Sequence, residues 1–141
     1  MPPHRKHRAK ERGVLRMFEQ DYIMRMIHQV IWAMLKMLFS IDNEAPAQDW
    51  FRDEEEKALL RELIDMVDSG QIGKAEDVVF ELADVADRKD LKLILLFFSY
   101  LNDKSDAFLE EDGFCREELQ KDLRTILAKY GVDAMAQMIQ P

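Results

Sequence analysis

Hydrophobic residues recur at helical spacing through most of the chain, and no segment alternates with the period of two that marks a half-buried strand. Helices are predicted over residues 53–68, 73–86, 91–101, 106–111 and 115–130, with a last short helix over 132–139. Asp53 fits the N-cap of the first of these helices, and Gly70 is well placed to end it. The pattern therefore predicts an all-α domain.

Residues 18–41 form a longer predicted helix with a wide apolar face. At 100° per residue, its hydrophobic side chains cover an arc of roughly 200°, whereas a helix that packs on a single core needs about half of that arc. We expect a partner to cover the surplus. The side chains expected at this interface are Ile23, Met26, Ile27, Val30, Met34, Met37 and Leu38.

The other helices predict how the core is built. The segment 91–101 is apolar on nearly all sides, so we expect it at the centre. Residues 53–86 predict an antiparallel helical hairpin, and this pair and the pair from residue 90 onward each span about 34 residues, the period of tetratricopeptide repeats. We expect a long N-terminal helix packed with helical hairpins, as a tetratricopeptide-like stack or as an irregular bundle.

Charge divides the chain into two parts. Residues 1–16 carry six basic residues and one acidic residue, a net charge of +5, so the total of −8 leaves −13 for residues 17–141. The first part has no apolar periodicity and is predicted to be a disordered basic arm. Residues 10–13 can be encoded by purine-rich codons like those of a bacterial ribosome-binding sequence. We therefore hypothesise that Met17 is the natural start and that the arm is translated leader. Residues 17–141 suffice for one helical domain.

This charge also limits the partners that we expect. An acidic body repels the phosphates of nucleic acids and anionic lipids, so nucleic acid is not an expected partner, and a membrane surface would need the basic arm. The single cysteine, Cys115, excludes an internal disulfide and indicates a reducing cytoplasmic setting.

Little in the sequence points to catalysis. No His, Cys or carboxylate spacing fits a metal site, and no cofactor motif or catalytic set is found, so we expect neither a cofactor nor an enzyme. Cys115 is a candidate reactive thiol, because a helix N-terminus lowers the pKa of a nearby thiol. The alternative is that Cys115 replaces serine as a helix cap.

Three stretches carry a family resemblance: MFEQDYIMRMI from Met17, LFFSYLNDK from Leu96 and FCREE from Phe114. They resemble a family of short bacterial proteins that is known only as a domain of unknown function. The resemblance covers residues 17–141 and implies no activity.

The function that we expect is a non-enzymatic protein-interaction or assembly module. It would form a homodimer through residues 18–41, or bind another protein there. The alternative is a peripheral membrane-surface protein that uses the same helix together with the basic arm.

Overall fold

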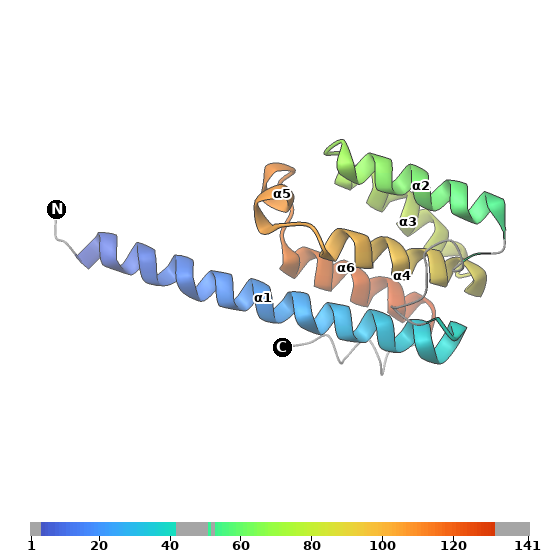
Figure 1. Cartoon of the computed structure of the whole chain (residues 1–141), viewed down its shortest axis with the longest axis horizontal. Helices are drawn as coiled ribbons and strands as arrows, with labels where there is room; N and C mark the ends of the chain where they lie inside the picture. Colours follow the sequence, from blue (N-terminus) through green and yellow to red (C-terminus); the bar gives the residue numbers. More distant parts are fainter. Residues whose placement is uncertain (1–3, 42–50, 52, 132–141) are drawn as a thin grey trace.

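The computed structural model describes residues 4–41, 51 and 53–131, and within these ranges the fold is all-α, as predicted (Figure 1). The helices are α1 (His4–Phe39), α2 (Glu54–Asp68), α3 (Ile72–Val85), α4 (Arg88–Asn102), α5 (Asp106–Glu111) and α6 (Arg116–Lys129). The helix predicted over 132–139 lies outside the described residues.

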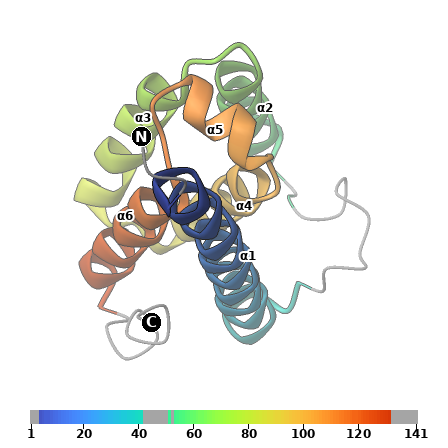
Figure 2. The ribbon, with the colours of Figure 1, turned by 90° about the vertical axis from the view of Figure 1, so that its left-hand side faces the viewer.

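The helices form layers around α4. Helix α1 packs against α4 and α6, whereas α2 and α3 cover α4 from the other side (Figure 2). All six residues from Leu93 to Phe98 are buried, which confirms the prediction that this segment is central. A helix that is apolar all round is stable only when it is covered on every side, and the layers on both sides of α4 provide that cover.

Helix α1 begins much earlier than the sequence analysis expected. Its backbone is helical from His4, so residues 4–16 continue the helix and project beyond the other helices (Figure 1). Arg, Lys, Ala and Glu, which dominate this segment, are strong helix formers. The segment has no apolar face that could pack on a core, but a helix can form without such a face.

The C-terminal end of α1 is closed by hydrogen bonds of its own backbone. Ser40 adopts a left-handed conformation with φ of 57°, and the amide of Ile41 donates to the carbonyl oxygen of Leu35 at 3.1 Å. The amide of Ser40 also donates to the carbonyl oxygen of Lys36 at 3.1 Å, as in an αL helix cap, and these bonds satisfy carbonyl groups of the last turn. The chain therefore leaves α1 in a fixed direction.

Helices α2 and α3 form the predicted hairpin. The Asp53 side chain accepts a hydrogen bond from the amide of Glu55 at 2.9 Å, and Gly70 has a φ of 79° in the turn after α2. The next long helix, α4, is followed by the six-residue α5, so the second helix pair does not repeat the first in length. A tetratricopeptide-like arrangement stays a prediction from the repeat length.

Candidate functional site

The seven side chains expected at an interface on α1 lie in three different environments. Four of them are buried in the domain's own core: Ile23, Ile27, Val30 and Met34. Met26 and Leu38 are half-buried, and Met37 is 67% exposed. Because α1 packs on two helices at once, a wide arc of its surface is covered within the domain. The width of the apolar face is therefore not in itself a measure of surface left for a partner.

A different face of α1 carries the exposed apolar side chains. Phe18 is 69% exposed and Tyr22 is 55% exposed, although neither was expected at the interface. With Met26, Ala33 and Met37 they lie within an arc of roughly 100°, which borders the buried face at Met37 and also contains the exposed polar residues Gln29 and Lys36. We call the five apolar residues the outward stripe. Spacings of four from Phe18 to Met26 could have indicated this stripe from the sequence.

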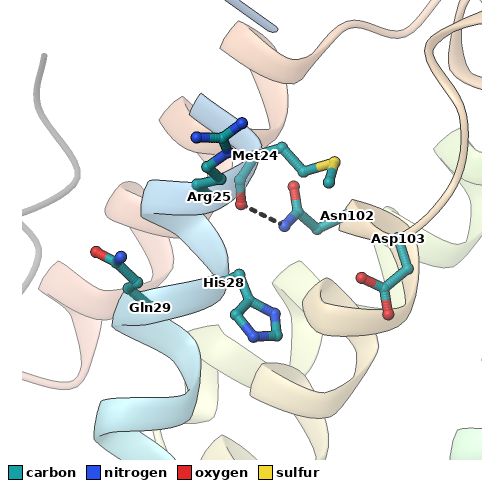
Figure 3. Close-up of a pocket in the computed structure, with 6 residues that line it drawn as sticks. All are labelled: Met24, Arg25, His28, Gln29, Asn102 and Asp103. Atoms are coloured by element: carbon teal, nitrogen blue, oxygen red, sulfur yellow. Dashed lines mark hydrogen bonds between the residues drawn. The ribbon is translucent and has the colours of Figure 1, made fainter. Parts of the chain in front are cut away.

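Two long-range contacts fix the rotation of α1 about its axis. The side-chain amide of Gln20 donates to both carboxylate oxygens of Glu117 on α6, at 2.8 and 2.9 Å. The side-chain amide of Asn102, at the end of α4, donates to the backbone oxygen of Met24 at 2.9 Å (Figure 3). These contacts hold the outward stripe in one orientation relative to the core.

Arg116 supports this attachment from inside the domain. Its side chain is only 2% exposed, and its Nε donates to Asp106 Oδ1 at 3.0 Å. Its Nη1 donates to the backbone oxygen of Asn102, and its Nη2 to that of Lys104. A buried guanidinium is stable when a carboxylate and several acceptors surround it, as they do here. Arg116 thus joins the start of α6 to the turn between α4 and α5.

A hollow of about 340 Å³ lies beside this attachment, between α1 and the end of α4 (Figure 3). It is lined by Met24, Arg25, His28, Gln29, Asn102 and Asp103. The Arg25 guanidinium is bound to Asp21 at 2.8 Å, and the Asn102 amide is bound to α1. These two polar groups are therefore engaged in contacts of the domain itself.

The pKa of the candidate thiol, Cys115, is shifted upward, whereas the sequence predicted a downward shift. Cys115 is half-buried at the N-cap position of α6, and its side chain makes no capping hydrogen bond. Burial raises the pKa of the Cys115 thiol. The guanidinium of the neighbouring Arg116 is bound to Asp106 and to backbone oxygens between α4 and α5. In the ranges that the structure describes, no three His, Cys, Asp or Glu side chains are placed to hold a metal ion.

An acidic pair that the sequence analysis did not predict, Glu76 and Asp122, lies between α3 and α6. Burial, together with a hydrogen bond to Asp122, raises the pKa of Glu76 to about 9. One of its carboxyl oxygens, Oε2, is buried without a hydrogen-bond partner. A carboxyl group in this setting holds its proton at neutral pH, because ionisation would place a second negative charge beside Asp122. The pair therefore makes folding stability depend on pH, and it is remote from the outward stripe in sequence.

Residues 17–131 match a family that is described only as a family of unknown function, DUF6483. The chain belongs to this family. The outward stripe, Gln20, Asn102 and Arg116 all lie within the part that matches DUF6483. Comparison with curated proteins and with solved structures gives no match. In the described part of this DUF6483 chain, no helix combines the length and apolarity that are needed to cross a membrane.

Proposed function

We propose that this domain is a non-enzymatic protein-interaction or assembly module that forms a homodimer through the outward stripe of α1. The observation that carries the proposal is the clustering of exposed apolar side chains. Of the five large hydrophobic residues that are most exposed in the described ranges, Met17, Phe18, Tyr22 and Met37 lie on α1, and Val85 lies on α3. Apolar side chains exposed singly need no explanation, but several on one face of a helix, as Phe18, Tyr22 and Met37 are, favour an interaction surface.

The way α1 is held also supports an interaction surface. The Gln20 contact to α6 and the Asn102 contact to α1 keep the stripe rigid, so little conformational entropy is lost when a partner binds. A contact made through one helix is small for a dimer interface, so we expect a dissociation constant in roughly the micromolar range. The raised pKa of the half-buried Cys115 thiol does not favour a nucleophilic role for this residue.

The test is the mass of the full chain in solution, measured by light scattering after size-exclusion chromatography over a range of concentrations. We expect the mass to rise with concentration to twice the 16.6 kDa of one chain. Tyr22→Glu combined with Met37→Glu places charges on the stripe and should leave a folded monomer. Val85→Glu is the matched control, because Val85 is 77% exposed but lies on α3, and it should leave the dimer intact. A monomer at every concentration would overturn the proposal.

Membrane-surface binding is the second candidate, and a specific observation favours it. Phe18 and Tyr22 are exposed immediately after the segment 1–16 with its net charge of +5, and aromatic side chains next to basic ones suit an anionic bilayer surface. The charge of −13 on residues 17–141 opposes it. Co-sedimentation with vesicles of phosphatidylserine and phosphatidylcholine separates the two: the homodimer proposal predicts that the protein stays in the supernatant.

A further inference from the structure

The hollow between α1 and the end of α4 places an unpaired carboxylate opposite an imidazole. Asp103 follows the last residue of α4, and its carboxylate has no hydrogen-bond or ion-pair partner in the part of the chain that the structure describes. The ring of His28, on α1, points towards this carboxylate across the hollow (Figure 3). No hydrogen bond or ion pair joins these two described residues, so room for a ligand group lies between them.

The charges around the hollow leave one negative charge uncompensated. The three cations that line this hollow and the adjoining one are each paired with an aspartate other than Asp103. The pairs are Arg25 with Asp21 at 2.8 Å, Lys104 with Asp68 at 2.7 Å and Arg116 with Asp106 at 3.0 Å. The net charge of −13 on residues 17–141 adds to the attraction of a cation. The hollow therefore favours a ligand with one positive charge.

The lining of the hollow indicates what kind of cation fits. In the described ranges, no three His, Cys, Asp or Glu side chains are placed to hold a metal ion. Met24 supplies a flexible apolar side chain, which packs well on alkyl groups. The volume of about 340 Å³ lies at the lower end of the range for small-ligand pockets. A primary ammonium group carries N–H donors only, and both a carboxylate and a neutral imidazole nitrogen accept hydrogen bonds from it.

We propose that this hollow binds a small primary alkylamine, with its ammonium group between Asp103 and His28 and its alkyl chain on Met24. The ammonium group donates one hydrogen bond to a carboxylate oxygen of Asp103 and another to the unprotonated ring nitrogen of His28. The residues of the outward stripe do not line the hollow, so this inference is independent of the proposed homodimer.

NMR titration of the full chain tests the site, with n-butylamine as the probe at neutral pH. Salt at about 0.1 M screens the non-specific attraction of a cation to the acidic surface. We expect saturable shifts of the Asp103 backbone amide and the Asn102 side-chain amide, with a dissociation constant of about 1–10 mM. Butyrate has a similar chain with the opposite charge, and it should cause no saturable shift.

Four variants separate this site from general attraction to an acidic protein. Asp103→Asn should weaken butylamine binding about fivefold or more, because it removes the charged acceptor. Asp65→Asn is the matched control, because Asp65 is exposed on α2, and it should leave the dissociation constant unchanged. His28→Arg places a fixed positive charge beside the hollow and should abolish binding, whereas His28→Gln keeps an acceptor and should retain it.

Three results would overturn the proposal. The first is the absence of saturable shifts with butylamine, and the second is equal binding by Asp103→Asn and the unmodified chain. The third is equal binding of butyrate and butylamine. Asp103 and His28 are both exposed, so their variants are expected to fold, and a circular dichroism spectrum of each variant checks this.

Discussion

Arg116 Nη1 lies 2.7 Å from the backbone oxygen of Asn102 and 3.2 Å from its side-chain oxygen, so one guanidinium nitrogen holds both groups of this residue. The amide nitrogen of the same Asn102 side chain donates to Met24 on α1. The charge of Arg116, buried at the start of α6, is thereby linked through one asparagine to the helix that carries the outward stripe. The attachment of α1 to the core depends on this chain of contacts.

Loss of Arg116 should therefore destabilise the fold and loosen α1. We expect Arg116→Ala to lower the free energy of unfolding by about 3–5 kcal/mol, because it leaves Asp106 and two backbone oxygens without their donor. Urea denaturation measures this change. Arg61→Ala is the control, because Arg61 is exposed on α2, and it should change the value by no more than about 0.5 kcal/mol. Equal effects of the two changes would contradict the structural role of Arg116.

Two methionines three positions apart on α1 should respond differently to the same truncation. Met34 is fully buried, so Met34→Ala should cost about 2–5 kcal/mol of folding stability. Met37 is 67% exposed, so Met37→Ala should leave the stability of the monomer within about 0.5 kcal/mol and weaken only the dimer. Urea denaturation at low protein concentration gives the first comparison, and light-scattering mass gives the second. A large loss of monomer stability from Met37→Ala would mean that its face is covered within the domain.

The Glu76–Asp122 pair should make stability depend on pH between about 4.5 and 9. The folded-state pKa of Glu76 is raised from 4.5 to about 9 by burial and by Asp122, so the folded chain keeps a proton that the unfolded chain releases. Stability from this group is fully present below about pH 4.5 and is lost as pH rises towards 9. Glu76→Gln mimics the protonated acid and should flatten this dependence, with a gain on the order of 1 kcal/mol at pH 9 after allowance for partial exposure.

Urea denaturation between pH 5 and pH 9.5 measures the pH dependence of both proteins. Glu81→Gln is the matched control, because Glu81 is exposed on the same helix, and the slope should be unchanged in that variant. A wild-type stability that rises over this interval, or an equal slope in Glu76→Gln, would contradict the assignment of the retained proton to Glu76.

The Cys115 thiol should react slowly while the protein is folded. Burial raises its pKa, so less of it is thiolate at neutral pH than in a free cysteine, and the thiolate is the reactive form. We expect iodoacetamide to modify the folded protein at pH 7.5 more slowly than free cysteine, and the urea-unfolded protein at a similar rate. Mass spectrometry follows the reaction, with Cys115→Ser as the blank. A faster reaction in the folded state would restore Cys115 as a reactive thiol.

Local rules in the sequence determined much of this fold. The predicted bounds 106–111 coincide with α5, and the predicted Asp53 cap and the Gly70 turn are both present. The uninterrupted apolar run within α4 was sufficient to place that helix at the centre. These features depend on the spacing of side chains along a single helix and on backbone preferences at its ends, which neighbouring residues in the sequence already contain.

The tertiary structure alone decided which face of α1 points outward and what Arg116 does. Apolar periodicity shows how wide a face is, but not whether one helix or two will cover it. Ile27 and Met34 were therefore assigned to a partner, although both are buried in the domain itself, where α1 packs on α4 and α6. The burial of Arg116 depends on Asp106 and Asn102, which belong to other elements of the chain. Such long-range contacts exist only once the helices are packed, because the sequence pattern of one helix does not specify its neighbours.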